Sequence, residues 1–318
     1  MGRAERNANK KKKKWPKYVG ITFLVLLLAI GGYAFYLYQS LATTVGKMHD
    51  ERGPSGLRTK SINLKNGEPI SVLVMGVDQR EGDKGRADTL ILLTVNPNSN
   101  SMQMTSIPRD TRVELVSRDE NGKLVNKGQD KINHSFAFGG ADMTINTVEK
   151  FLDVPVDFFV EMNMEGLQQI VDSLGGIQVE NTLAFSYDGF DFPVGTLNLN
   201  GQEALSYARM RYEDPKGDFG RQDRQRQVIS GIIDEAVSPA ILTKMDDIFE
   251  TMGGNMTTNM SFDEMKIVQA KYKDARKNVE TFTMQGTGQT IGGVWYFIVP
   301  EEERQAVSSR VKQHLEIE

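Results

Sequence analysis

The sequence predicts an α/β fold: one extracytoplasmic domain with a central mixed β-sheet covered by helices, preceded by a single transmembrane helix. From about residue 69 onward, apolar strand-like segments alternate with segments of helical periodicity, which is typical of a sheet with helices packed on its faces. Before them lies an uncharged run of 21 residues, 18–38. At about 1.5 Å per residue, a helix of that length spans roughly 31 Å, enough to cross the hydrocarbon core of a bilayer.

The orientation of this span follows from the charge in front of it. Residues 1–17 contain eight basic side chains and one acidic side chain. Because positive charge is retained on the cytoplasmic side, we expect 1–17 inside and the rest of the chain outside, as in a single-pass type II protein of the cell membrane. A cleaved signal peptide is the alternative, but bulky Tyr36 and Tyr38 stand where small residues would be needed for cleavage. Against a membrane span, the lysine run is better explained as topogenic charge than as a nucleic-acid-binding tail.

Composition excludes several classes of protein. The whole chain has a net charge of −4 and residues 1–17 carry +7, so the remainder carries −11. An acidic domain argues against nucleic acid as the partner. The chain has no cysteine, which excludes disulfide scaffolds, zinc–thiolate sites and cysteine nucleophiles.

The N-terminal elements can be placed from their polarity. Residues 39–68 are polar and contain Gly53, Pro54 and Gly56, so we expect a linker or stalk there. The domain of residues 69–318 then begins with three predicted strands, at 70–77, 89–95 and 102–107. The second of these is dense in Leu and Ile, as in strands that are buried on both faces.

Further along the chain, helices and strands alternate. Helices are predicted at 139–152, 164–174, 222–237, 261–276 and 300–315, with another beginning at Asn200. Strands are predicted at 156–162, 177–179, 279–284 and 294–299. Asn200 with Glu203, and Ser261 with Glu264, have the spacing of a capping box. The glycines between 286 and 293 do not match a dinucleotide-binding loop and predict a turn between the last two strands.

Several common catalytic motifs are missing. The sequence contains neither the glycine-rich phosphate-binding loop of nucleotide-binding proteins nor a Gly-x-Ser-x-Gly elbow. Its three histidines, His49, His134 and His314, are scattered along the chain. A Ser-His-Asp triad or a histidine-based metal site is therefore not expected.

Aspartates stand at the ends of the first predicted strands. Asp78 directly follows the first strand, and Asp88 precedes the second after a short loop that contains Arg86. Such a loop makes the two strands antiparallel, so both carboxylates should lie at one end of the sheet. Two carboxylates without histidine suit a hard cation such as Mg²⁺. Turn or capping aspartates are the alternative for either residue taken alone. Arg109 and Asp110 follow the third strand.

A second polar cluster consists of five arginines within eighteen residues: Arg209, Arg211, Arg221, Arg224 and Arg226. A helix N-terminus with inward-facing arginines favours phosphate, because exposed N–H groups and guanidinium groups both bind its oxygens. A solvated charged face is the alternative interpretation, and it fits Arg224 and Arg226 better than Arg211 and Arg221.

One face of the helix after Arg221 changes character along its length. At helical spacing, Arg221 and Gln225 share a face with three apolar residues, Val228, Ile229 and Ile232. Asp218 is placed to cap this helix. The aspartates and arginines together, without a strong nucleophile, predict phosphoryl or pyrophosphate chemistry by positioning and charge stabilisation.

Six motifs stand in order along the chain: Met75-Gly-Val-Asp78, Arg86-Ala-Asp88-Thr, Ser106-Ile-Pro-Arg109-Asp110-Thr, Lys131-Ile-Asn-His134, Leu199-Asn-Gly-Gln-Glu-Ala-Leu-Ser-Tyr-Ala-Arg209-Met-Arg211, and Asp218-Phe-Gly-Arg221-Gln-Asp-Arg224-Gln225-Arg226-Gln227. With them, the chain resembles the LytR-CpsA-Psr family from about residue 69 to the C-terminus. The resemblance implies transfer of anionic glycopolymers, such as wall teichoic acid, from undecaprenyl pyrophosphate to peptidoglycan. The acceptor would be the hydroxyl on carbon 6 of N-acetylmuramic acid, and the lipid tail would lie in an apolar tunnel.

The resemblance also implies roles for individual residues. Asp78 and Asp88 would hold Mg²⁺. The transfer itself also needs a base for the proton of the acceptor hydroxyl, and Asp88 and Asp110 are the two candidates. Catalysis is expected to depend on Asp78, Asp88, Arg109, Arg211 and Arg221. Substrate binding is expected to involve Arg86, Asp110, Lys131, Arg209, Asp218, Arg224 and Gln225. The implied partners are the polyprenyl-linked glycopolymer, peptidoglycan and the lipid bilayer.

Two other functions would use the same residues. A hydrolase would send the same lipid pyrophosphate to water, and a non-catalytic protein would only bind it. The presence of both aspartates beside the arginines favours catalysis over binding alone. Transferase and hydrolase differ in which nucleophile reaches the site.

Overall fold

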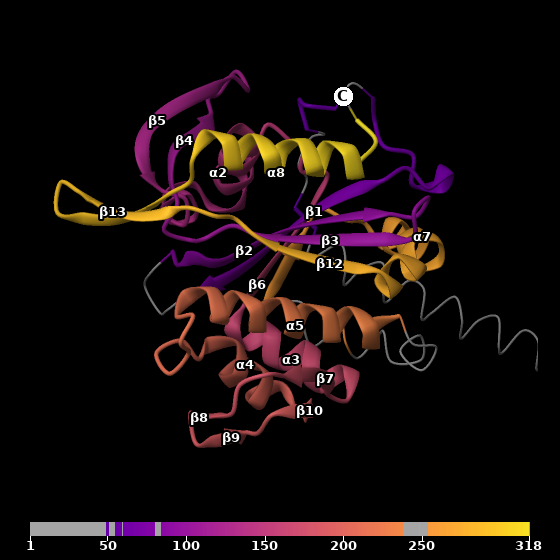
Figure 1. Cartoon of the computed structure of the whole chain (residues 1–318). Coiled ribbons are helices and arrows are strands. Elements are labelled where there is room, and N and C mark those ends of the chain that lie inside the picture. The colour runs from indigo at the N-terminus through magenta and orange to yellow at the C-terminus, as the bar shows by residue number, and fades with distance from the viewer. Residues whose placement is uncertain are drawn as a thin grey trace, which may run out of the picture.

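The computed structural model describes residues 49–50, 55–58, 60–79, 84–237, 248 and 254–317 (Figure 1). The predicted cytoplasmic tail and membrane span, residues 1–38, lie outside this part of the chain. None of the helices in the described part is long and apolar enough to cross a bilayer.

A six-stranded mixed sheet forms the centre of the domain, as the sequence predicts. In spatial order its strands are β11 (Met256–Thr258), β6 (Phe158–Asn163), β1 (Ile70–Asp78), β2 (Arg86–Asn96), β3 (Ser101–Ser106) and β12 (Val279–Thr283). β1 pairs in parallel with β6, and β3 with β12, whereas the other neighbours are antiparallel. The carboxyl ends of β1, β6, β3 and β12 therefore meet at one end of the sheet, which we call the carboxyl edge.

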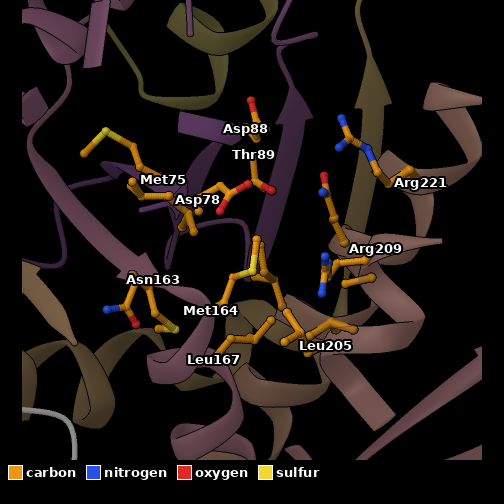
Figure 2. A pocket seen from close by; sticks show the side chains of 18 of the residues that line it. Met75, Asp78, Asp88, Thr89, Asn163, Met164, Leu167, Leu205, Arg209 and Arg221 are labelled. Carbon is orange, nitrogen blue, oxygen red and sulfur yellow. The ribbon is translucent and has the colours of Figure 1, made fainter. Parts of the chain in front are cut away.

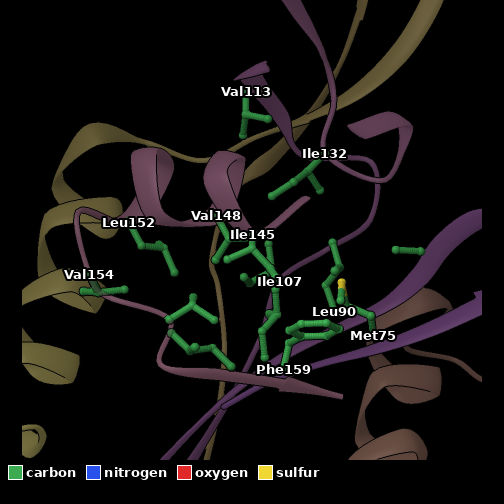
Figure 3. Close-up of a cluster of buried hydrophobic side chains, with 14 of the residues drawn as sticks. Met75, Leu90, Ile107, Val113, Ile132, Ile145, Val148, Leu152, Val154 and Phe159 are labelled. Atoms are coloured by element: carbon green, nitrogen blue, oxygen red, sulfur yellow. The ribbon is translucent and has the colours of Figure 1, made fainter. Parts of the chain in front are cut away.

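Helices cover both faces of this sheet (Figure 1). On one face lie α2 (His134–Leu152) and α8 (Glu301–His314), and on the other lie α5 (Asp218–Ala236) and α7 (Phe262–Tyr272). Strand alternation separates the two cores: Leu73 of β1 faces α2 and α8, whereas its neighbour Val72 faces the other layer. Figure 3 shows the first of these cores, in which sheet residues such as Met75 and Leu90 belong to one cluster with Ile145 and Val148 of α2.

A smaller unit packs below α5 in Figure 1. It contains α3 (Met164–Leu174), α4 (Gly201–Arg209), the strand pair β7 (Ile177–Asn181) and β10 (Gly195–Leu199), and the hairpin of β8 (Phe185–Tyr187) and β9 (Phe190–Phe192). Its core surrounds the fully buried Tyr207, where burial raises the pKa of the phenol to about 12. The predicted capping boxes of Asn200 with Glu203 and of Ser261 with Glu264 are both confirmed.

Two hairpins and several helix boundaries differ from the prediction. The hairpin of β4 (Arg112–Arg118) and β5 (Leu124–Lys131) was not predicted, because β5 is polar and its side chains are mostly exposed. β13 (Thr287–Ile291) pairs with the predicted β14 (Val294–Ile298), and Gly292 and Gly293 form the turn between them. α2 begins five residues before the predicted start and is kinked at Gly139 and Gly140, and two short 3₁₀ helices occur at Leu64–Asn66 and Lys273–Lys277.

Part of the predicted stalk packs on the domain. His49 forms a bridge with Thr258 of β11, and the Asp50 N–H donates to the Thr258 carbonyl at 2.9 Å. Arg58 forms a bidentate ion pair with Asp157, with its Nη2 2.6 Å from the carboxylate. Leu64 is buried against the sheet. The domain therefore extends towards the N-terminus well beyond the predicted boundary at residue 69.

Candidate active site

The two predicted aspartates lie beside one cavity at the carboxyl edge (Figure 2). β1 ends at Asp78, and the antiparallel β2 begins at Arg86. Because Gly76 pairs with Thr89 and Val77 pairs with Ala87, Asp88 is an extra residue in β2, which makes a β-bulge. A bulge redirects a side chain out of the regular alternation of its strand. Both carboxylates line the same cavity as a result.

The Asp88 carboxylate is held from two further elements. Arg109, just after β3, donates from Nη1 to one carboxylate oxygen at 2.7 Å. Asn133, just before α2, donates from Nδ2 to the other oxygen at 3.0 Å. Sequence reasoning assigned no role to Asn133, although it stands inside the Lys131–His134 motif. Its place inside that motif was the available signal, because the helix was predicted to begin only at residue 139.

Asp110 and Lys131 extend this network away from the cavity. Lys131 Nζ lies 2.6 Å from one Asp110 oxygen, and Arg109 Nε lies 3.7 Å from the other. Both side chains are half-buried, and neither lines the cavity. The ion pairs therefore place these two predicted substrate-binding residues behind Arg109 and orient its guanidinium group.

The arginines form the opposite wall. Arg209 ends α4, Arg211 follows two residues later, and Arg221 stands in the first turn of α5; all three line the cavity with Gln225. Figure 2 shows Arg209 and Arg221 across the cavity from Asp78 and Asp88. This arrangement brings together two carboxylates and four cationic side chains, counting Arg109, from separate segments of the chain.

Asp218 does not cap α5 as the sequence suggested. The helix begins at Asp218 itself, after Gly217, and no side-chain cap is present. The Asp218 carboxylate lies instead 2.7 Å from Arg221 Nη2 and 3.5 Å from Arg211 Nε. Its physical role is to orient two arginines, which is why it stands at the start of this helix without capping it.

The Arg221 guanidinium is positioned to bind an anion. The exposure of the residue is 9%, and its buried Nε has no hydrogen-bond partner among the described residues. Burial lowers the pKa of the Arg221 guanidinium and the charges of Arg109 and Arg211 lower it further, although Asp218 and Asp88 oppose this. A buried, unsatisfied cationic donor is costly, and a phosphate oxygen in the cavity would satisfy it.

The cavity changes from charged to apolar along its length. Its volume is about 390 Å³, and α5 contributes the predicted face of Arg221, Gln225, Val228, Ile229 and Ile232. Beyond the arginines, the apolar part is also lined by residues of β1, β6, α3 and α4: Val74, Met162, Met164, Leu167 and Leu205. The prediction that this helix face passes from polar to apolar within one turn is confirmed.

Arg224 and Arg226 are buried, so the solvated-face interpretation of these two residues was wrong. Arg224 pairs with Asp214 at 2.6 Å and donates to the carbonyls of Tyr207 and Met210. Its guanidinium is used within the protein and does not line the cavity, which removes it from the predicted substrate-binding set. Arg226 instead ties α5 to the ends of β3 and β12.

Replacing Arg224 with alanine is expected to lower the free energy of unfolding by about 3–5 kcal/mol, because Asp214 would be left buried without its partner. Burial alone would raise the pKa of Asp214, but the hydrogen bond and charge of Arg224 hold it below 3.8. The lowered pKa of Asp214 therefore adds to the free energy of unfolding above pH 3.8, and this stabilisation is lost as the pH falls through the folded-state pKa. Chemical denaturation at pH 7 measures the effect. The matched control is Arg276→Ala, which removes an exposed ion pair with Asp234; equal losses in both variants would contradict the structural role.

Two other predicted residues lie at the margin of the site. Arg86 is exposed at the start of β2 and does not line the cavity. Arg209 lies 3.9 Å from Asp188 through Nη1, and its side chain is more exposed than that of Arg221. A phosphate entering from solvent would meet Arg209 before it reached Arg221.

The donor set at the cavity fits a magnesium ion. In the described part of the chain, no three His, Cys, Asp or Glu side chains gather closely enough to form a complete metal site. Asp78, Asp88 and the Thr89 hydroxyl offer oxygen ligands at the cavity wall. Mg²⁺ commonly takes one or two carboxylates, with the remaining positions filled by water and substrate phosphate.

Comparison with known proteins gives full-length matches. The chain is 49% identical over 312 residues to the "Polyisoprenyl-teichoic acid--peptidoglycan teichoic acid transferase TagU" of Bacillus subtilis, covering 98% of this chain and 99% of that protein. It is 47% identical to the protein of the same name from Bacillus licheniformis, again over 98% and 99%.

Solved structures agree with these matches. The crystal structure of B. subtilis TagU aligns with a TM-score of 0.62 at 45% identity, covering 79% of this chain and 98% of that chain. A structure described as "TagT bound to LIIa-WTA" aligns with a TM-score of 0.70 at 30% identity, covering 83% and 97%. The model of the LytR_cpsA_psr family matches residues 35–313. The chain therefore belongs to the LytR_cpsA_psr family.

Proposed function

We propose that this protein is a phosphotransferase that attaches an anionic glycopolymer of the wall teichoic acid type to peptidoglycan. The donor is the polymer linked to undecaprenyl pyrophosphate, and the acceptor is the hydroxyl on carbon 6 of N-acetylmuramic acid. The observation that carries the proposal is the two-part cavity, in which an Asp–Arg mouth leads directly into an apolar body. A polyprenyl pyrophosphate likewise has a charged part, the pyrophosphate, and an apolar part, the prenyl chain. The names of the relatives support the same donor and acceptor classes.

The residues that line the cavity have different roles in the proposed reaction. Arg209, Arg211 and Arg221 bind the pyrophosphate oxygens and neutralise charge that develops on the bridging oxygen as it leaves. Arg109 is fixed between Asp88 and Asp110, so it contributes positive charge at a defined position. The hydrophobic wall beyond Gln225 receives the first isoprene units.

The reaction breaks a phosphoanhydride bond of the donor and forms a phosphoester bond to the acceptor. The acceptor oxygen attacks the phosphorus nearest the polymer, the bond from that phosphorus to the bridging oxygen breaks, and undecaprenyl phosphate leaves. Asp88 takes the hydroxyl proton, because it lines the cavity and Asp110 does not. A magnesium ion held by Asp78 and Asp88 would supply further positive charge against the phosphate oxygens.

Location follows from the substrate. We propose that residues 18–38 anchor the chain in the cell membrane and that the domain lies outside, since a polyprenyl carrier stays in the bilayer. His49 and Asp50 are attached to β11, so only residues 39–48 separate the predicted span from the domain. Fully extended, those ten residues reach at most roughly 36 Å. The short reach keeps the cavity near the outer leaflet.

The test is an assay with a polyprenyl-pyrophosphate-linked saccharide, peptidoglycan oligomers and Mg²⁺. We expect saccharide to become attached to the glycan and polyprenyl phosphate to be released in equal amount. A donor with a short prenyl chain should be used less efficiently, because it leaves the apolar part of the cavity unfilled. Release of phosphorylated saccharide at the same rate without acceptor would instead identify a hydrolase. Binding of donor without turnover would identify a binding protein.

A further inference from the structure

An uncharged hairpin projects from the domain beside the proposed active site. β12 ends at the carboxyl edge, and the chain continues into β13 and β14, which extend away from the sheet (Figure 1). Residues 281–300 contain no charged side chain, within a domain rich in acidic and basic residues. The proposed chemistry of the cavity uses none of these residues.

One face of this hairpin carries aromatic rings over glycines. Gly288 pairs with Phe297, and Thr290 pairs with Trp295, so these four residues share a face. A Cβ atom at Gly288 would lie 2.9 Å from the Trp295 indole, and one at Gly286 would lie 2.8 Å from the Phe297 ring. Any side chain at these glycines would displace the rings. The glycines therefore keep the indole packed over β13, while 48% of Trp295 remains exposed.

This aromatic face continues to the arginines. The Phe297 ring contacts the Phe219 ring edge-on at 5.9 Å, and the Phe297 N–H donates to the Asp110 carbonyl at 2.9 Å. Phe219 is 38% exposed and follows Asp218, which orients Arg211 and Arg221. We call the row of Phe219, Phe297 and Trp295 the aromatic track. Its ends are exposed, and Phe297 is buried between them.

The chemistry of the track differs from that of the cavity. The cavity mouth attracts polyanions, whereas the track offers ring surfaces and the hydroxyl of Thr290 without any charge. Exposed aromatic side chains with a polar surround commonly form the energetic centre of a binding surface. Sugar rings suit such a surface, because their C–H faces pack on aromatic rings and their hydroxyls hydrogen-bond at the edges.

We infer that the aromatic track binds the glycan strand of the peptidoglycan acceptor and leads its hydroxyl to the cavity mouth. The inference rests on the proposed transferase function and adds the acceptor subsite to it. The donor supplies the phosphates that the arginines bind, so the uncharged track is left for the partner that contributes only a hydroxyl.

A lipid surface is the other class of partner that an exposed tryptophan could meet. The tip of the hairpin is Gly292 and Gly293, and the hairpin has no basic residue to attract anionic lipid. The segment that follows the predicted membrane span joins the domain at β11, through His49 and Asp50. The hairpin follows β12, which is the strand at the opposite side of the six-stranded sheet. These features favour the glycan.

Tryptophan fluorescence tests the track directly, because the chain contains only Trp15 and Trp295. The full chain carrying Trp15→Phe is placed in phospholipid nanodiscs and titrated with N-acetylglucosamine–N-acetylmuramic acid oligomers. We expect a saturable change in Trp295 emission. Brominated phosphatidylglycerol in the same discs should leave that emission unquenched. Quenching by the brominated lipid, or emission that oligomers do not alter, would overturn the inference.

Kinetics and calorimetry of variants give the second readout. Trp295→Ala should raise the acceptor KM and the oligomer Kd by roughly tenfold, with the donor KM and the maximal rate unchanged. Trp295→Phe should recover part of this loss, and Val294→Ala, an exposed apolar residue on the opposite face, should cause none. An unchanged oligomer Kd in Trp295→Ala would refute the track. If the wild-type chain bound oligomers through Trp295 but transferred nothing, the proposed function would fail and the glycan surface would stand.

Discussion

Replacing Arg221 with alanine is expected to lower the rate of polymer transfer by about 10²–10³-fold while the domain remains folded. Arg221 lies almost wholly buried at the junction of the charged and apolar parts of the cavity, and its Nε has no hydrogen-bond partner in the part of the chain that the structure describes. The guanidinium is therefore positioned for substrate oxygens. Its removal loses the ion pair with Asp218 but also removes the cost of burying the guanidinium and its repulsion with Arg109 and Arg211. These effects offset one another, so the loss should appear mainly in transfer. Initial rates and thermal unfolding measure the two quantities separately.

The controls separate charge from geometry. Arg276→Ala removes an arginine of similar length from the exposed ion pair with Asp234, and it should leave transfer unchanged. Arg221→Lys keeps a positive charge but loses the planar fork of donors, so it should recover only a small part of the activity. Near wild-type transfer by Arg221→Ala would show that the anion binds elsewhere.

Replacing Asp88 with asparagine is expected to reduce transfer at least a hundredfold and to abolish its dependence on Mg²⁺. The substitution keeps the size of the side chain but removes the charge that pairs with Arg109 and would hold the metal. Asp78→Asn should weaken the apparent affinity for Mg²⁺ in the same direction. The measurement is the transfer rate over a range of Mg²⁺ concentrations after treatment with a chelator.

Asp153→Asn is the matched control for these changes. Asp153 pairs with Lys312 on the surface, and its left-handed backbone conformation, with φ of 52°, also suits asparagine. This variant should keep the wild-type rate and Mg²⁺ response. If Asp88→Asn retained the wild-type Mg²⁺ response, the metal assignment would be wrong, even if transfer became slower.

Local patterns in the sequence predicted much of the fold correctly. The five strands predicted for the sheet, at 70–77, 89–95, 102–107, 156–162 and 279–284, are all present. The segments 70–77, 89–95 and 156–162 are rich in apolar residues, whereas 102–107 and 279–284 mix apolar with polar residues. The mixed helical face of α5 was also predictable, since residues three and four apart always share a helix face. β5 was missed because a polar strand held by backbone hydrogen bonds leaves no hydrophobic pattern.

Charge in the sequence proved a poor guide to exposure. Arg224 and Arg226 looked like surface residues among acidic neighbours, yet both are buried with partners that are distant in sequence. Asp218 has a capping residue type but orients arginines instead. Asp218–Arg221 and Arg226–Asp223 are pairs three residues apart within α5, which helical spacing allows. The burial of these arginines and their contacts with other elements are set by packing, about which local spacing contains no information.

The sequence by itself determined the alternation of elements, the aspartates at strand ends and the helix face that joins Arg221 to an apolar stripe. These are properties of neighbours along the chain, where backbone geometry alone sets which side chains align. Only the tertiary structure decided that Asp88 is the bulged residue of β2 and that Asn133 and Arg109 donate hydrogen bonds to its carboxylate. It also placed the aromatic track beside the arginines. Those contacts join segments brought together by the sheet, so they exist only once the sheet has formed.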